Sequence, residues 1–84
     1  MNEISTKGRL TALLGRRQME TGERLSLRRL AAVARVPKDF VYRLDAGEAR
    51  YVDLAALTRL CAALQCDLGE ILVWDHDDNG DEPI

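Results

Sequence analysis

The side chains best suited to bind a ligand lie on one face of a short helix expected over Pro37–Ala46. With Val36, Val41 and Leu44 turned inward, the outward residues are Pro37, Lys38, Asp39, Tyr42 and Arg43. Lysine and arginine can donate hydrogen bonds to guanine O6 and N7, aspartate can accept one from cytosine N4, and tyrosine can bind a base or a phosphate. A helix that carries such groups near its N-terminus fits the major groove of DNA.

The same residues also have explanations that need no ligand. Asp39 falls in the first turn of the helix, where a carboxylate stabilises the helix dipole. Tyr42 can lie over the helix surface, and Lys38 and Arg43 can be solvated charges. We expect Phe40, beside the outward face, to pack under the preceding helix.

Two short helices joined by a tight turn, within Leu25–Gly47, are expected to position this face. The first helix carries an apolar stripe of Leu30, Ala31 and Ala34. Pro37 opens the second helix, because the N–H that proline lacks would be unpaired in a first turn, and Gly47 ends it. A small Ala31 facing Val41 lets the helices cross closely at a steep angle, as in a helix-turn-helix.

Apolar and small residues recur in this stretch at a specific spacing. With Leu27 as the first motif residue, they fall at the fourth, fifth, tenth, fifteenth and eighteenth positions. This spacing resembles the helix-turn-helix of the Cro and phage-repressor type, the XRE-like family. Asp45-Ala46-Gly47 looks like that family's acidic-x-Gly helix end, and Val52–Leu72 looks like its last two helices. The resemblance implies an all-α, compact five-helix bundle over residues 7–74 that binds double-stranded DNA sequence-specifically as a transcriptional repressor or regulator.

The resemblance also implies contacts with the DNA backbone. The N-terminus of the first motif helix, which Ser26 can cap, offers N–H groups and a positive dipole end to a phosphate. Arg50 and Tyr51 match loop residues that contact DNA in the family. The candidate DNA-binding residues are therefore Ser26, Leu27, Arg28, Pro37, Lys38, Asp39, Tyr42, Arg43, Arg50 and Tyr51.

Three positions depart from the family pattern. Leu27 stands where many members have a glutamine that helps to hold a phosphate. Arg35 stands where the turn usually has glycine, so a left-handed non-glycine residue is either tolerated or absent. Leu14 occupies the position of an arginine that often pairs with the acid at Asp45, and Arg17, one turn later, is a possible substitute.

The remaining elements flank the motif. Residues 1–6 are expected to be a flexible lead, with Ser5 or Thr6 capping a helix that begins near Lys7 and ends at Met19 or Glu20. Asp53 caps a helix whose buried face is Leu54, Leu57, Leu60, Cys61 and Leu64. Asp67 caps a last helix from Leu68 to about Val73. Residues 75–84 are expected to form an acidic, disordered tail, and no strand is expected.

Known members of the family act as dimers on palindromic half-sites, centred about one helical turn (~34 Å) apart. We therefore expect a homodimer whose surface is the apolar end of the domain: Leu68, Ile71, Leu72, Val73 and Trp74. The alternative is that Trp74 merely closes the core.

Length and residue usage restrict the class of protein further. A chain of 84 residues forms one domain, and it has neither an apolar run of transmembrane length nor a signal-peptide core in Met1–Lys7, so a cytoplasmic protein without membrane contact is expected. Cys61 and Cys66 are expected to point to different sides, which argues against a disulfide or a metal site. His76 has no Ser or Cys partner nearby and there is no glycine-rich phosphate loop, so no enzyme, cofactor or small-molecule ligand is expected.

The charge distribution leaves a second function open. The net charge is −2, but the 12 Lys and Arg all precede residue 75, against nine Asp and Glu, so this part carries +3 and residues 75–84 carry five acids. The local electrostatic field at the binding surface, and not the net charge of the chain, decides whether DNA binds. However, the negative charges of Asp39, Asp45 and Glu48 weaken the positive potential around the motif. A weaker potential would suit a protein-interaction module, antitoxin-like or anti-repressor, on the same fold. A further hypothesis is that the tail covers the basic face and competes with phosphate.

Overall fold

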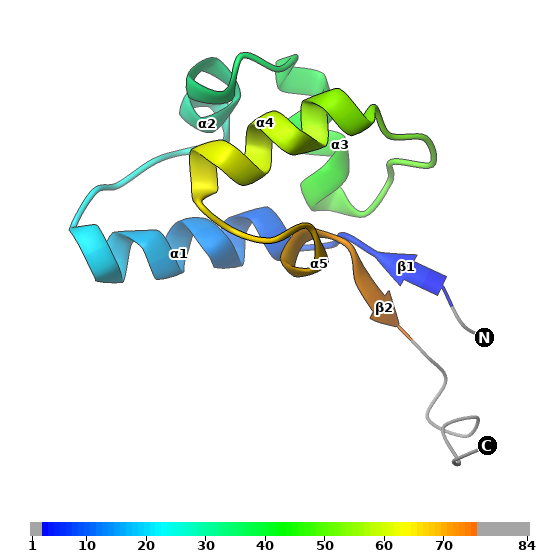
Figure 1. The fold of residues 1–84 in the computed structure, drawn as a ribbon, viewed down its shortest axis with the longest axis horizontal. Coiled ribbons are helices and arrows are strands. Elements are labelled where there is room, and N and C mark those ends of the chain that lie inside the picture. The colour runs from blue at the N-terminus through cyan, green and yellow to red at the C-terminus, as the bar shows by residue number, and fades with distance from the viewer. Residues whose placement is uncertain (1–2, 76–84) are drawn as a thin grey trace, which may run out of the picture.

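The computed structural model describes residues 3–75; residues 1–2 and 76–84, and with them most of the expected acidic tail, lie outside the described part. Within residues 3–75 the chain forms five helices and two short strands (Figure 1). In chain order these are β1 (Glu3–Ser5), α1 (Arg9–Thr21), α2 (Leu27–Ala34), α3 (Lys38–Ala46), α4 (Leu54–Leu64), α5 (Leu68–Ile71) and β2 (Val73–Asp75). The expected five-helix, mainly helical bundle is confirmed.

The core lies between α1 and the group formed by α2, α3 and α4 (Figure 1). Its fully buried side chains come from all five helices: Leu10, Leu30, Val41, Leu44, Leu57, Leu60 and Ile71. Burial of one such side chain stabilises a fold by about 1.5–3 kcal/mol. Because α3 contributes Val41 and Leu44 to this core, its opposite face is fixed at the surface.

The buried face of α4 differs from the expected one. Leu57, Leu60 and Leu64 are buried, but Leu54 is 70% exposed and Cys61 is only half-buried. The small Ala56 is buried in addition. The 3.6-residue repeat explains this correction, because it centres the core face on Ala56, Leu57 and Leu60 and leaves Leu54 on the flank of the helix.

The N-terminus of α1 is capped from another helix. The expected caps, Ser5 and Thr6, do not cap it; Gly8 precedes the helix with φ of 70°, and the hydroxyl of Thr6 donates to the carbonyl of Leu44. The Asp45 carboxylate at the end of α3 accepts hydrogen bonds from the Thr11 N–H (3.0 Å) and hydroxyl (2.6 Å). The Gly8 N–H also donates to the Asp45 carbonyl at 2.8 Å. These bonds fix the end of α3 against the start of α1.

Arg17 therefore does not pair with Asp45, so the expectation that it replaces the family's arginine at this pairing is wrong. Its guanidinium instead forms an ion pair with Glu23 at 3.2 Å and donates to the Ala63 carbonyl at 3.2 Å. The reason is geometric: Arg17 lies six residues beyond Thr11, the residue that Asp45 binds, so at 3.6 residues per turn it is on a different side of α1.

The two strands were not expected. β1 pairs antiparallel with β2 in the register Glu3↔Asp75, Ile4↔Trp74 and Ser5↔Val73, so residues 3–5 of the segment expected to be a flexible lead form a strand. The last helix ends at Ile71 instead of Val73, because Leu72 adopts extended backbone angles (φ −101°, ψ 104°). The strands lie side by side at one end of the molecule (Figure 1). No local periodicity could reveal a pairing between residues about 70 positions apart.

Candidate nucleic-acid interface

The helix-turn-helix forms as its sequence predicts. The Ser26 hydroxyl caps α2 by accepting from the Arg29 N–H at 3.1 Å. Arg35 ends α2 in the left-handed region (φ 61°, ψ 46°), so the non-glycine residue is tolerated there. The N–H groups of Arg35 and Val36 bond to the Ala32 and Ala31 carbonyls at 3.3 and 3.0 Å, which closes the turn. Gly47, with φ of 78°, ends α3.

The orientation of α3 also matches its expected faces. Val41 and Leu44 are fully buried and Val36 is 7% exposed. The predicted outward set is exposed, with Tyr42 at 43%: Pro37, Lys38, Asp39, Tyr42 and Arg43. Phe40 is half-buried against the core. Pro37 stands just before α3, with extended angles, so its missing N–H costs no helical hydrogen bond.

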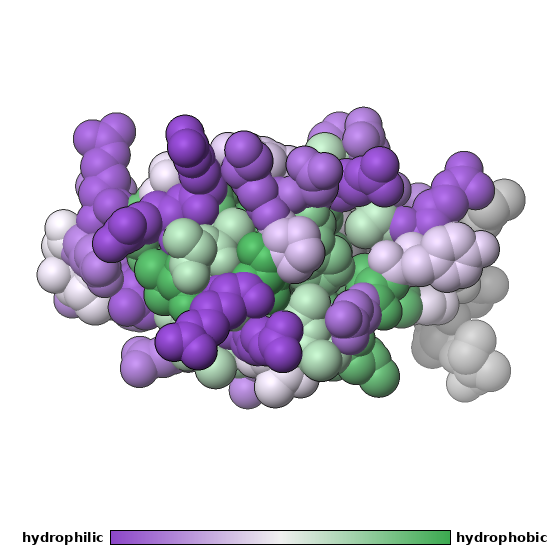
Figure 2. Space-filling view, turned by 90° about the horizontal axis from the view of Figure 1, so that it is seen from above, coloured by the Kyte–Doolittle hydropathy of each residue, from purple (hydrophilic) through white to green (hydrophobic). Residues whose placement is uncertain are grey.

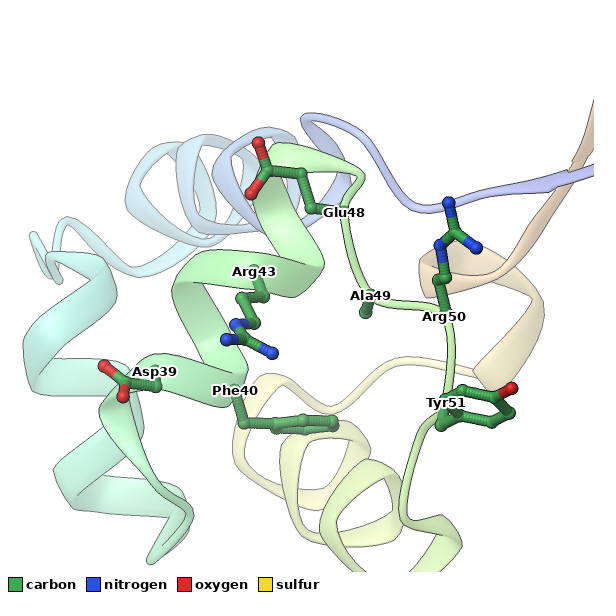
Figure 3. A pocket seen from close by; sticks show the side chains of 7 residues that line it. All are labelled: Asp39, Phe40, Arg43, Glu48, Ala49, Arg50 and Tyr51. Atoms are coloured by element: carbon green, nitrogen blue, oxygen red, sulfur yellow. The ribbon is translucent and has the colours of Figure 1, made fainter.

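Arg43, Arg50 and Tyr51 meet around one hollow of about 550 Å³ between α3 and the loop that follows it. Figure 3 shows Arg43 and the Phe40 ring on the α3 side, and Arg50 and Tyr51 on the loop opposite. Tyr51 is 93% exposed. Asp39, Glu48 and Ala49 complete the lining. The sequence predicts a role for each of the two arginines and for Tyr51, but it carries no local signal that Phe40 and Glu48 border the same hollow.

The cations of this face form no ion pair inside the described part of the chain. The ion pairs between residues 3–75 join Arg16 of α1 to Glu70 of α5, and Arg17 of α1 to Glu23 in the loop that follows it. The exposed cations of the motif, Arg28, Lys38, Arg43 and Arg50, have no ion pair within that range. From above, hydrophilic side chains project around the edge of the molecule and frame patches of apolar surface (Figure 2). Within residues 3–75 these cations are therefore unpaired, and Asp39 and Glu48 are the acids that border the same hollow as Arg43 and Arg50.

The N-terminal end of α2 forms a separate surface. Ser26 and Leu27 border a different hollow of about 300 Å³, together with Gln18 and Arg24, which sequence reasoning did not single out as its lining. The Ser26 hydroxyl already accepts a hydrogen bond from the Arg29 N–H, whereas the N–H groups of Leu27 and Arg28 make no hydrogen bond to another described residue. The structure therefore does not bring Ser26, Leu27 and Arg28 into the hollow of Arg43 and Arg50; it places them on a second flank of the motif.

The expected dimer residues do not form one exposed surface. Ile71 is fully buried in the core of the single chain, and Leu72 and Val73 are half-buried. Leu68 and Trp74 remain exposed, at 43% and 56%. Trp74 lies on β2 instead of the last helix, because that helix ends one turn after it begins.

The fold and the exposed face of α3 define a helix-turn-helix DNA-binding domain. A family model for the Cro/C1-type helix-turn-helix DNA-binding domain matches residues 9–77, and the chain belongs to this family. The comparisons with curated proteins and with solved structures gave no match. In residues 3–75, no helix has the length and apolar character needed to cross a membrane.

Proposed function

We propose that this protein is a cytoplasmic transcriptional regulator, a repressor, that binds a specific operator in double-stranded DNA. The observation that carries the proposal is the cluster of cations on α3 and its following loop, free of internal partners among residues 3–75, in a helix-turn-helix of the Cro/C1 type. An exposed helix of this kind enters the major groove, where side chains near its N-terminus meet base edges.

The residues of the motif divide by role. Lys38, Asp39, Tyr42 and Arg43 project from the exposed face of α3 and read base edges, with Pro37 at the entry of the helix. Arg50 and Tyr51, on the loop, bind the phosphate backbone. Ser26, Leu27 and Arg28 approach a phosphate on the other flank, where the two free N–H groups and the dipole of α2 attract an anion. Contacts on both flanks would fix the register of α3 in the groove.

A homodimer on a palindromic operator is part of the proposal. Trp74 and Ile4 form a cross-strand pair and are 56% and 59% exposed, and Leu68 is 43% exposed nearby in the chain. Exposed apolar groups of this size favour association. In the proposed dimer, two α3 helices would bind the two half-sites in successive major grooves.

Selection from a pool of random duplex DNA, followed by sequencing at two salt concentrations, tests this function. The expected result is an enriched palindrome that Lys38→Ala and Arg43→Ala fail to enrich. Arg59→Ala, which removes the same charge from an exposed position of α4, is the matched control and is expected to enrich the same sequence. Weak, sequence-blind binding that disappears at the higher salt, or no binding, would contradict the proposal and favour a protein-interaction module on this fold.

A further inference from the structure

The two cysteines share one hollow, which corrects the expectation that they point to different sides. Cys61 and Cys66 are both half-buried free thiols, and both line a space of about 390 Å³ that Leu54 and Leu68 also border. The expectation failed because helical spacing does not extend across the turn that ends the helix. The helix ends at Leu64, and the chain turns back on itself between the two cysteines.

A left-handed residue causes this reversal. Gln65 has φ of 54° and ψ of 50°, and its N–H bonds to the Cys61 carbonyl. The Cys66 N–H bonds to the same carbonyl at 3.1 Å. This second bond spans six residues and is the signature of a Schellman-type helix end, in which the side chains of the first and last residues come into contact. Here those two residues are Cys61 and Cys66.

The environment of the two thiols favours a disulfide bond between them once it has formed. Burial raises the pKa of the Cys66 thiol to about 11, and the neighbouring Cys61 adds to the rise. A thiol with a high pKa is a slow leaving group and is not stabilised as a free thiolate. A disulfide between these residues would therefore form slowly and resist reduction.

We propose that Cys61 and Cys66 form a dithiol site that closes to an intramolecular disulfide by exchange with a small-molecule disulfide such as oxidised glutathione. One cysteine, as thiolate, attacks the glutathione disulfide, forms a mixed disulfide and releases one reduced glutathione. The second cysteine gives its proton to solvent and attacks the mixed disulfide at the protein sulfur, which releases the second glutathione. The protein loses two electrons and two protons, and the glutathione disulfide gains both.

Closure would tie the last turn of α4 to the corner that leads into α5. Cys66 immediately precedes Asp67, whose N–H donates to the Glu70 carboxylate at 2.9 Å in the cap of α5. Glu70 also pairs with Arg16 on α1. The disulfide would thus fasten α4 to a corner that is already anchored to α1. This property is independent of DNA binding.

The test equilibrates the full chain in buffers of reduced and oxidised glutathione, starting separately from the reduced protein and from protein oxidised with diamide. Free thiols are then trapped with acid and the protein is analysed by mass spectrometry. The expected native product has lost two hydrogens (about 2 Da) and carries no glutathione. Cys66→Ser, the matched control, is expected to carry one glutathione on Cys61.

The same equilibration in concentrated urea separates the effect of the fold from mere closeness in sequence. Because the helix end holds the thiols together, the native chain is expected to favour the closed disulfide at least about tenfold more than the unfolded chain. By linkage, the oxidised form then melts at a higher temperature than the reduced form. Three results would overturn the proposal: a preference in the native chain that is equal to or smaller than that of the unfolded chain, native protein with two separate glutathione adducts, or free thiols whether the protein started reduced or oxidised.

Discussion

Arg43→Ala and Arg50→Ala are expected to weaken DNA binding in two different ways. Arg43 is exposed on α3, and the loss of a guanine contact there costs about 1–3 kcal/mol, or about 5- to 150-fold in Kd, on the selected operator only. Arg50 stands on the loop across the hollow, where we propose that it binds a phosphate. Its loss should weaken binding to every sequence and lower the slope of log affinity against log salt by about 0.9.

The assay is fluorescence anisotropy on the selected duplex and on a scrambled duplex, between about 50 and 200 mM salt. Over this fourfold range, one lost phosphate contact changes the salt-induced fall in affinity by about 3.5-fold, which the assay resolves. Arg59→Ala controls for net charge, because it removes one exposed cation from α4. Equal losses and equal slopes for all three variants would refute the assignment, since only overall charge would then matter.

The remaining predictions concern stability, redox chemistry and regulation. Asp45→Ala should lower the free energy of unfolding by about 0.5–2 kcal/mol in urea titrations, because the Thr11 N–H at the start of α1 loses its cap, whereas Asp45→Asn should lose less. Arg35→Gly should raise it by up to about 1 kcal/mol, because glycine adopts the left-handed angles without strain; a loss of stability would refute that reason. The raised pKa of Cys66 favours its protonated form in the fold, so this contribution to stability is complete below pH 9.0 and lost as the pH rises towards about 11; iodoacetamide labelling of the native thiol should lag behind that of the unfolded chain across this range. If the acidic tail competes with phosphate, removing residues 75–84 should tighten DNA binding at low salt, and unchanged affinity rules the competition out.

The helix-turn-helix could be predicted because its signals are local. Ser26 and Gly47 mark a helix start and a helix end, and the apolar residues between them repeat at helical spacing. That spacing alone separates Val41 and Leu44 from the exposed residues of α3. The outward face was therefore readable from the sequence, even though Arg35 replaces the usual glycine in the turn.

Contacts between distant segments could not be read in the same way. Asp45 caps Thr11, 34 residues earlier, and Ile4 pairs with Trp74 across almost the whole chain. Neither pairing leaves a periodic signal. The single left-handed residue Gln65 also limits what spacing can predict. It reverses the chain at the end of α4 and brings together two cysteines that helical spacing would separate. The hollow between Arg43 and Arg50 likewise depends on how the loop folds back beside α3.

Binding of DNA to the exposed face of α3 can be observed residue by residue by NMR. Backbone amide shifts of ¹⁵N-labelled protein would be followed during titration with the selected duplex. We expect the largest changes in α3, in the loop around Arg50 and Tyr51, and at the start of α2 around Arg28, while Arg59 on α4 changes little. Changes centred on the hollow between Leu54 and Leu68, or none in α3, would contradict it.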